Sequence, residues 1–476
     1  MSLRTYQAQA LDEISAIWKK GEKKVLLVLP TGGGKTVIFS EAMKRAAAKG
    51  KRSLMAVRGR HLVDQASKRL MRENVPHGVI MAGHWNYRPK ELMQICSIDT
   101  LLSRCDKGGE AWPEADFIVL DEAHFAVSKG YHKMMQNYKN AYVLGVTATP
   151  YVDKPLRHIA NEIVRPISFK QLVSDGFLLN ARYYAPSIPD LKNVKTSSST
   201  KDYVVEDLAS AMQKGGLVGS VVSEWKARAS DRLTICFAVN VEHSKNIVQE
   251  FKNAGIPAEH VEAETKEKER HAILERLEKG ITKVVSNVGI LCTGVDLPFV
   301  SCIIMNRPTK SYNLYVQQAG RGTRPFPGKT DFLLLDHAGN VLRHNYISHE
   351  PEANLDGKEK LKDGSGLKTC SYCFSVYAGF NCDCGFKEEM DQDYSKERKI
   401  LNIEGSLVEL EEMPFEAKVL QEVESLKKQA KAKGYKRGWI YYKLVDKYGE
   451  DTAKRFFKQR VVPDWILRKS MSLANG

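Results

Sequence analysis

The sequence predicts an α/β protein in which two parallel-sheet units follow one another, and three observations support this. Short apolar runs alternate with amphipathic stretches from residue 1 to about residue 345. The alternation starts again after about residue 216, and a polar loop, Ser197–Lys201, separates the two runs. Buried strands that alternate with helices are typical of parallel sheets covered on both faces.

The expected elements are distributed over both units. In the first unit we predict strands at Val25–Leu29, Ser53–Val57, Met93–Ser97, Phe117–Leu120 and Ala141–Val146, and helices at Val37–Ala48 and His61–Arg72. In the second we predict strands at Thr234–Ala238, Lys283–Ser286, Cys302–Met305 and Phe332–Leu335, and helices at Ser244–Ala254 and Glu267–Lys279. The charged stretch Glu350–Gly366 indicates a linker. The predicted divisions are 1–165, 166–345, 346–366 (linker), 367–388 (cysteine module) and 389–476 (helical, basic region).

Composition narrows the function classes. The 476 residues are enough for several domains of ~100–200 residues each. No run of about 18 apolar residues occurs and the N-terminus lacks a signal-like pattern, so we expect no membrane partner and a cytoplasmic protein. The formal charge of +15 favours a nucleic-acid partner, although a merely soluble basic protein has the same charge.

A glycine-rich loop follows the first predicted strand and precedes a helix. Such a strand–loop–helix setting turns backbone N–H groups toward phosphate oxygens. Lys35 is positioned to reach the β- and γ-phosphates, and the Thr36 hydroxyl to ligate Mg²⁺. Leu29 stands where the strict pattern has its first glycine, and the alternative is a flexible turn. The proposed ATP-binding residues of the loop are Thr31, Gly32, Gly33, Gly34, Lys35 and Thr36.

A second buried strand ends in two acids, Asp121 and Glu122, followed by Ala123 and His124. Acids at a strand end suit a Mg²⁺ ligand and a base for the attacking water. We therefore predict that Asp121 holds Mg²⁺, directly or through water, and that Glu122 orients and deprotonates the water.

These residues, with others in the same order, resemble the superfamily 2 helicases of the DEAD/DEAH-box type over about residues 3–345. The further matching runs are Arg4-Thr5-Tyr6-Gln7, Thr147-Ala148-Thr149-Pro150, Thr293-Gly294-Val295-Asp296-Leu297-Pro298 and Gln317-Gln318-Ala319-Gly320-Arg321-Gly322-Thr323-Arg324. The resemblance implies two RecA-like lobes with ATP bound between them. It also implies adenine recognition by Gln7 with Arg4, further ATP contacts from Gly294 and Asp296, and coupling through His124, Thr147 and Thr149.

The role of the last of these runs, residues 317–324, follows from the chemistry of phosphoryl transfer. The transition state of phosphoryl transfer carries charge on its oxygens, and a guanidinium from another lobe neutralises it, which raises the rate ~10³–10⁵-fold. Arg321 and Arg324 are three residues apart and can face the same cleft from one helical turn. We predict that both act on the phosphate, with Gln317 near the γ-phosphate. The alternative for either arginine is a structural ion pair.

A nucleic-acid track is expected beside the ATP site. Arg58 follows a strand and opens a helix, where a phosphate can bind. Short hydroxyl side chains at strand ends suit backbone contacts, and they suit helix capping equally well. By resemblance to the family's motifs the track residues are Arg58, Gly83, Ser97, Thr100, Asn240 and Thr293. Contacts of this kind read the backbone, so binding should weaken steeply with salt.

The nine cysteines divide into scattered, buried-type residues and one cluster. Four thiolates in close pairs suit tetrahedral, structural Zn²⁺. The second pair has one intervening residue where the usual ribbon has two, and the alternative is free thiols. The expected zinc ligands are Cys370, Cys373, Cys382 and Cys384.

The C-terminal region interleaves lysine, arginine and aromatic residues. Cations meet phosphates and rings stack on bases, so Lys436, Arg437 and Trp439 are candidate nucleic-acid contacts. The alternative is a small helical bundle with an aromatic core and solvated lysines.

Within the superfamily, the arginine motif followed by Leu334-Leu335-Asp336-His337-Ala338-Gly339-Asn340 and a cysteine module resembles the RadD-type helicases and related phage and prophage helicases. The cysteine module is shorter here than in that group. The resemblance implies an ATP-dependent DNA helicase or translocase, most simply a monomer, acting on single-stranded, forked or branched DNA in repair or recombination. The alternatives are an RNA helicase, a duplex translocase of a restriction or defence complex, and an inactive binding module.

Overall fold

The computed structural model describes residues 3–150, 155–185, 191, 193–198, 200–214, 217–292, 295–351 and 353–356, and beyond them 367–369, 376–378, 408–410, 423, 426 and 437–448. The chain forms two compact units. The first comprises Met1–Ser365 with Ile400–Leu407, and the second Gly366–Lys399 with Val408–Gly476. The two lobes, each built on a parallel sheet, belong to the first unit.

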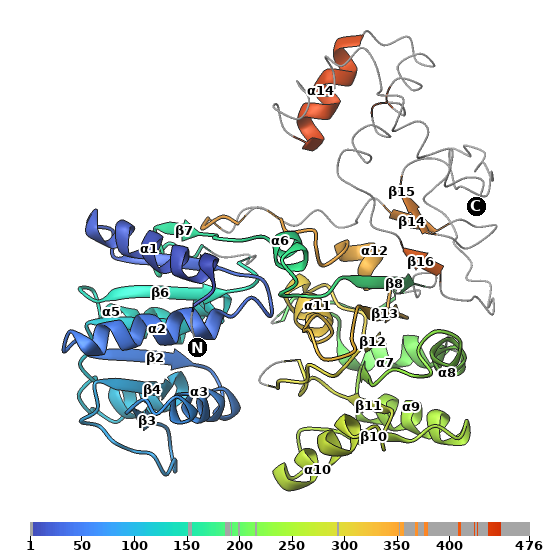
Figure 1. Cartoon of the computed structure of the whole chain (residues 1–476), viewed down its shortest axis with the longest axis horizontal. Helices are drawn as coiled ribbons and strands as arrows, with labels where there is room; N and C mark the ends of the chain where they lie inside the picture. Colours follow the sequence, from blue (N-terminus) through green and yellow to red (C-terminus); the bar gives the residue numbers. More distant parts are fainter. Residues whose placement is uncertain are drawn as a thin grey trace. The chain divides into compact units, whose positions relative to one another are not determined.

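Lobe one is built on a sheet in the order β3-β4-β2-β5-β6-β1-β7, and all its pairings are parallel. Helices α1 and α2 pack against each other, and α2 also lies against β2, β5 and β6 (Figure 1). The elements are α1 (Thr5–Lys19), β1 (Lys24–Val28), α2 (Lys35–Ala48), β2 (Ser53–Val57), α3 (Arg60–Arg72), β3 (Gly78–Ile80), β4 (Met93–Ser97), α4 (Ile98–Leu101), the π-helical turn η1 (Leu102–Lys107), β5 (Phe117–Asp121), the 3₁₀ turn η2 (Ala123–Val127), α5 (Lys129–Gln136), β6 (Tyr142–Thr147) and β7 (Glu162–Val164).

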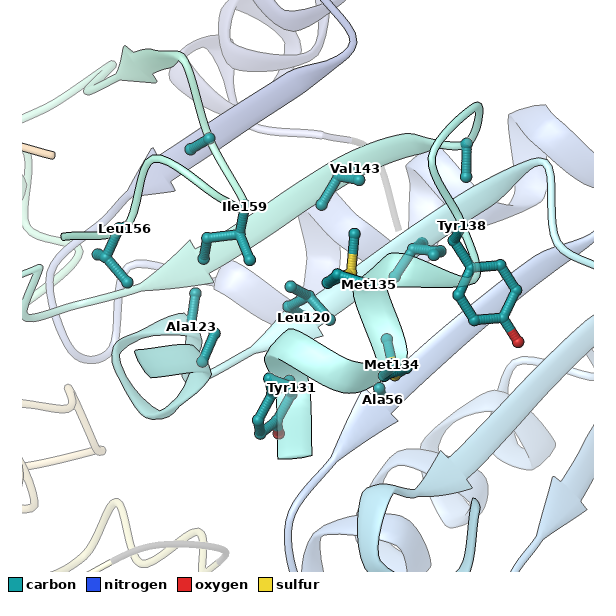
Figure 2. Close-up of a cluster of buried hydrophobic side chains, with 14 of the residues drawn as sticks. Ala56, Leu120, Ala123, Tyr131, Met134, Met135, Tyr138, Val143, Leu156 and Ile159 are labelled. Carbon is teal, nitrogen blue, oxygen red and sulfur yellow. The ribbon is translucent and has the colours of Figure 1, made fainter. Parts of the chain in front are cut away.

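The core of lobe one explains why its strands are apolar throughout. Alternate strand residues such as Ala56, Leu120 and Val143 point to one face, where they meet α5. Figure 2 shows Tyr131, Met134 and Met135 of that helix gathered around Leu120 and Ala56. Because helices cover both faces, both sets of alternating side chains are buried and the strands lack a polar face.

Lobe two has a second parallel sheet, in which the strands follow the order β10-β11-β9-β12-β13-β8. Its elements are α6 (Phe169–Ser174), β8 (Ala181–Ala185), α7 (Val205–Lys214), α8 (Leu217–Arg228), β9 (Thr234–Phe237), α9 (Val241–Asn253), β10 (Ala258–Val261), α10 (Glu267–Glu278), β11 (Val284–Asn287), β12 (Cys302–Met305), α11 (Tyr312–Ala319), β13 (Phe332–Asp336) and α12 (Asn340–His344). The predicted α/β class and the two parallel sheets are confirmed.

The segment after α12 packs against lobe one, although the sequence predicts a linker there. The Leu156 amide donates to the Leu355 carbonyl over 2.8 Å, and Leu355 is buried in the core of lobe one. Arg157 holds Asp356 through two nitrogens, at 2.7 and 3.1 Å. Residues 353–356 are therefore part of lobe one, although they follow lobe two in the sequence.

The second unit contains a two-stranded antiparallel hairpin, β14 (Leu367–Thr369) and β15 (Val376–Ala378), together with β16 (Val408–Leu410) and α14 (Arg437–Tyr448). Val423 and Leu426 are buried with Ile440 and Leu444 of α14. None of the helices in the described ranges combines the length and apolar character needed to cross a bilayer.

Candidate active site

The candidate residues of lobe one gather at one edge of its sheet. Strands β1, β5 and β6 are parallel neighbours, so the loops that follow them meet at their carboxyl ends. These loops carry the glycine turn, the acidic pair and the Thr147–Pro150 run. The loops after β2, β3 and β4, which carry the proposed track, emerge from the same edge.

Two glycines of the loop have backbone angles that favour glycine. Gly32 and Gly34 both have φ near +85°, and Gly34 precedes the first residue of α2. A Cβ on Gly34 would stand 2.5 Å from Gln7 Nε2. Lys35 and Thr36 then open the helix, half-buried. The loop can therefore present its N–H groups and the helix N-terminus to an anion.

The N-terminal Gln7 supports the glycine loop. Gln7 is buried, and its side-chain oxygen accepts from the Arg4 amide over 3.0 Å. Tyr6, which the sequence analysis did not single out, donates its hydroxyl to the Gly33 carbonyl over 2.7 Å. The Arg4 guanidinium lies 4.0 Å from the centre of the Phe177 ring. Tyr6 thus holds the loop directly, and Gln7 supports it through Tyr6, to whose hydroxyl its Nε2 donates over 3.5 Å.

A pocket of about 740 Å³ opens beside this motif, with Arg4, Tyr6 and Phe177 among its lining residues. Because Arg4 and Phe177 already stack on each other at 4.0 Å, a planar base can pack on an outer face of this pair but not between its members. Phe177 lies far from the motif in the sequence, and no local pattern marks it.

The acidic pair is buried and strained. Burial and the neighbouring Glu122 carboxylate raise the pKa of Asp121 to about 7, against the opposing effect of Lys35. Glu122 has φ +48°, in the left-handed region that costs a non-glycine residue of order 1–3 kcal/mol. Its Oε2 is buried with no hydrogen-bond partner among the described residues. A strained carboxylate with a free buried oxygen is suited to hold a water molecule.

A short hydrogen-bonded chain runs from His124, whose Nδ1 lies 3.3 Å from Glu122 Oε2, to the Thr147–Pro150 run. His124 Nδ1 lies 3.1 Å from the Thr147 hydroxyl, which accepts the Thr149 amide over 3.1 Å. Burial lowers the pKa of His124, so its ring is neutral near pH 7. The hydroxyl can then donate to Nδ1 while it accepts from Thr149. The three predicted coupling residues are therefore in direct contact.

Lobe two contacts the glycine loop through the arginine motif. A Cβ on Gly320 would stand 2.6 Å from Thr31 Cγ2, and a Cβ on Gly32 would stand 3.4 Å from Thr323 Oγ1. Burial lowers the pKa of Arg321, while the Cys292 thiol and the Glu122 carboxylate oppose that shift. This contact between the two lobes, called the seam below, thus brings together the glycine loop, the proposed base Glu122 and the arginine motif.

The two arginines are held by polar partners within lobe two. Arg321 donates to the carbonyls of Cys292 and Val295, at 3.1 Å from its Nε to Cys292. Arg324 forms an ion pair with Asp296, which was itself predicted to contact ATP. Gln317 is half-buried on α11. Thr293 and Gly294 lie outside the described residues.

The proposed track residues differ in accessibility. Arg58 is exposed directly after β2, and Gly83 has φ +65° with no atom near its Cβ position. Thr100 accepts the Ala82 amide over 3.4 Å. Ser97 is buried at the end of β4, because strand pairing encloses it, and offers little surface to a strand of nucleic acid. Asn240, predicted as a track residue, caps α9 by accepting the His243 amide over 2.8 Å.

The candidates of the second unit are only partly described. Trp439 packs half-buried against the small cluster formed with α14, which agrees with the bundle alternative for this residue. Lys436 and all four cysteines, Cys370, Cys373, Cys382 and Cys384, lie outside the described residues. Arg437 begins α14, and its side chain is not described.

Two family models match the chain. The model described as "Type III restriction enzyme, res subunit" matches residues 1–152, and that described as "Helicase conserved C-terminal domain" matches residues 217–325. The first match contains the glycine loop and the acidic pair, and the second contains Arg321 and Arg324. The two matches therefore fall on the two lobes that meet at the seam.

Relatives and solved structures agree with these matches. The chain is 29% identical over 359 residues to IRC3 of Saccharomyces cerevisiae, which is named as an ATP-dependent helicase. The match covers 71% of this chain and 51% of IRC3, so the chain spans about half the length of that relative. It is 27% identical over 472 residues to the 51.5 kDa protein of a Lactococcus phage, covering 93% of this chain and 99% of that protein. The fold resembles that of the ATP-dependent Type ISP restriction-modification enzyme LlaBIII bound to DNA, with TM-score 0.55, 20% identity and coverage of 71% and 27%. The chain belongs to the superfamily 2 helicases, a family of ATP-hydrolysing enzymes.

Proposed function

We propose that the protein is a DNA-stimulated ATPase that moves along single-stranded or branched DNA and remodels it in repair or recombination. The observation that carries the proposal is the seam, where Gly320 of lobe two meets Thr31 of the glycine loop beside the acidic pair. A nucleotide bound there contacts both lobes, so binding and hydrolysis change how the lobes are held.

The residues at the seam fit Mg²⁺·ATP. The Asp121 carboxylate and the Thr36 hydroxyl are oxygen ligands of the kind that Mg²⁺ prefers, and Mg²⁺ neutralises phosphate charge when bound. Lys35 contacts the β- and γ-phosphates, and the loop amides hold the remaining oxygens. Glu122 orients the attacking water through its free buried oxygen and accepts its proton.

Arg321 and Arg324 complete the site from lobe two. Gly320 and Thr323, beside them in sequence, contact the glycine loop, and each arginine exchanges its present partners for phosphate oxygens when ATP binds. Gln317 lies in the last turn of α11, which ends at Ala319, so Arg321 and Arg324 follow the helix and do not share the helical turn that the sequence predicts. Their charge stabilises the transition state, at a benefit of ~10³–10⁵ in rate.

The chain from Glu122 through His124 and Thr147 to Thr149 transmits the state of the γ-phosphate toward the track. Loss of the phosphate changes the position of Glu122, and the neutral His124 ring moves with it because the two side chains are in contact. The hydrogen bond between His124 and Thr147 then passes the movement on to Thr147. Alternating closure of the lobes on a polymer then gives directed stepping.

DNA is the proposed track for three reasons. The net charge of +15 favours a polyanion. The arginine motif and the segment after it resemble those of RadD-type helicases, and a phage relative matches nearly the whole chain. The structural neighbour LlaBIII is bound to DNA. That neighbour and the restriction-enzyme family model also support the second candidate, a duplex translocase of a restriction or defence complex.

We further propose a structural zinc site in the second unit, with Cys370, Cys373, Cys382 and Cys384 as its ligands. The described hairpin supports it, because Cys370 and Cys373 fall in the connection between β14 and β15, where zinc ribbons carry a ligand pair. Elemental analysis of protein purified without chelators should give about one zinc per chain for one four-ligand site. Metal-free, folded protein would refute the site.

One panel of ATPase assays tests the proposed function. Single-stranded, duplex, forked and four-way DNA are compared with RNA of the same sequence, because the 2′-hydroxyl distinguishes the two polymers. Forked or single-stranded DNA should stimulate most. Stimulation by duplex DNA without strand displacement favours the restriction-type translocase, and stimulation by RNA favours an RNA helicase. Turnover that no nucleic acid changes refutes the motor.

Two substitutions assign the chemistry. Lys35→Ala should abolish turnover, and near-normal rates would refute the phosphate-loop assignment. Glu122→Gln should trap ATP-bound protein on DNA, and unchanged turnover would exclude Glu122 as the base.

A further inference from the structure

The loop between β3 and β4, residues 81–92, presents two exposed aromatic side chains. Trp85 is 70% exposed and Tyr87 is 54% exposed. Single exposed apolar residues are common, but two large rings on one short loop expose apolar area that a folded protein usually covers. The loop starts at the carboxyl end of the edge strand β3, where the proposed track lies, and returns along β3 to the amino end of β4, with the Val79 amide donating to the Asn86 carbonyl over 2.9 Å.

Buried polar side chains hold this loop in a fixed shape. Asn86, between the two rings in sequence, is buried, and its Nδ2 donates to the His77 carbonyl over 3.2 Å. His77 is buried in turn and bonds Ser67 over 2.8 Å. At the far end of the loop, Gln94 Nε2 donates to the carbonyls of Arg88 and Glu91, at 2.8 and 2.9 Å. The exposed rings thus stand on a rigid support.

Trp85 itself is oriented by a second fixed ring. Its ring stacks on His84, with 5.6 Å between centroids and 25° between planes. His84 Nδ1 accepts the Asn86 amide over 3.1 Å, and its Nε2 lies 3.3 Å from Asp64 Oδ1. The His84 side chain is only 4% exposed. His84 therefore contacts one side of Trp85, while most of the Trp85 surface stays exposed to solvent.

Positive charge surrounds the rings. Arg60 donates to the Ala82 carbonyl over 2.7 Å at the start of the loop. Arg88 and Lys90 are exposed within it, and the Arg104 guanidinium lies 5.6 Å from the centre of the Tyr87 ring. Cations interleaved with exposed rings match a polymer that has anionic phosphates and planar bases.

We propose that Trp85, with Tyr87, forms a base-stacking platform for single-stranded nucleic acid beside the backbone track of lobe one. The proposal rests on the nucleic-acid motor described above and adds contacts to the bases. Thr100 and Arg60 bind the loop at Ala82, three residues before Trp85, so a strand whose phosphates pass Arg58 and Thr100 runs close to this part of the loop. Stacking accepts every base, which agrees with a motor that has little sequence preference.

A double comparison of protein and ligand tests the platform. The probes are a fluorescent 12-nucleotide oligothymidylate and an abasic oligonucleotide of equal length, both measured by anisotropy with the full-length protein. Trp85→Ala should weaken oligothymidylate binding about tenfold, because stacking of one base contributes that order of affinity. Trp85→Phe should restore most of the loss, whereas Trp85→Leu should not.

The abasic arm and one control separate stacking from other roles. On the abasic probe, the protein and its Trp85→Ala variant should bind equally. Ile281→Ala removes an apolar side chain that is 60% exposed in lobe two and should change neither affinity. Equal oligothymidylate binding by the Trp85→Ala variant refutes the platform and points to a protein partner for this loop. Failure of the unmodified protein to bind either probe refutes a track for single-stranded DNA, and with it the platform.

Discussion

Replacing Thr147 by valine removes one hydroxyl that links the acidic pair to lobe movement. The hydroxyl bonds His124 Nδ1 and accepts the Thr149 amide, each at 3.1 Å, and all three residues are buried. Valine has nearly the same shape but leaves both partners unpaired. An unsatisfied buried polar group costs ~1–3 kcal/mol, so with two such groups the free energy of unfolding should fall by roughly 2–6 kcal/mol.

The same change should weaken coupling. A net hydrogen bond contributes ~0.5–1.5 kcal/mol, and 1.36 kcal/mol corresponds to a tenfold change in rate. If the His124–Thr147 bond carries the signal, the ratio of DNA-stimulated to basal ATP turnover should fall between twofold and about tenfold.

The assay is steady-state ATPase activity with and without single-stranded DNA, at a temperature where circular dichroism shows the variant folded. Thr147→Ser, which keeps the hydroxyl, is the matched control and should retain the ratio. A valine variant whose stimulation ratio equals that of the unmodified protein would refute the role of this bond.

Other perturbations follow from the same geometry. Gly34→Ala should weaken ATP binding, measured by titration, because φ at this position is +85° and the new Cβ would meet Gln7. The control Gly50→Ala, at φ +69° with open space around the Cβ, should bind ATP normally. Equal ATP affinities of the two variants would contradict the supporting role of Gln7. Burial lowers the pKa of His243 to about 4, so the folded state binds fewer protons than the unfolded state below pH ~6.5, and stability falls as pH falls. Relative to His243→Gln, the protein should lose about 2 kcal/mol more between pH 8 and pH 5 in urea unfolding; parallel curves would contradict this. Leu355→Ala should lower the free energy of unfolding by ~2–4 kcal/mol, because it leaves a cavity in the core of lobe one. Asp356→Asn breaks only a surface ion pair and should lower it by under ~1 kcal/mol. Equal losses would show that residues 353–356 are a loose linker.

The sequence predicts the strands of both lobes because burial on both faces leaves an unbroken apolar signal. Strand ends differ by one or two residues, as for Val284–Asn287, predicted at Lys283–Ser286. The helix Thr5–Lys19 is not among the predicted elements, and four strands of the two lobes are missing from them: Ala181–Ala185, Ala258–Val261, Glu162–Val164 and Gly78–Ile80. The three residues of Gly78–Ile80 carry too little periodicity, and the pairing that forms such a strand is set by its neighbour β4.

The candidate site likewise contains residues that the sequence predicts and residues that only the structure reveals. The loop, the acids and the arginine motif are local patterns, and the sequence places each of them. Tyr6 on the Gly33 carbonyl, Phe177 under Arg4 and Leu355 in the core of lobe one depend on contacts between distant segments, which no local pattern encodes. Trp85 and Tyr87 are visible in the sequence as ordinary aromatics, and only their exposure singles them out.

The central claim is that ATP is hydrolysed at a seam where arginines of lobe two act on a nucleotide held by lobe one. The most direct measurement is the single-turnover rate of ATP hydrolysis by Arg321→Ala and Arg321→Lys at saturating ATP and single-stranded DNA. The rate should fall about 10³-fold or more with alanine, with lysine restoring only a small part because it lacks the planar fork, and ATP affinity should change much less. An alanine variant that hydrolyses ATP within about tenfold of the unmodified rate would contradict the account.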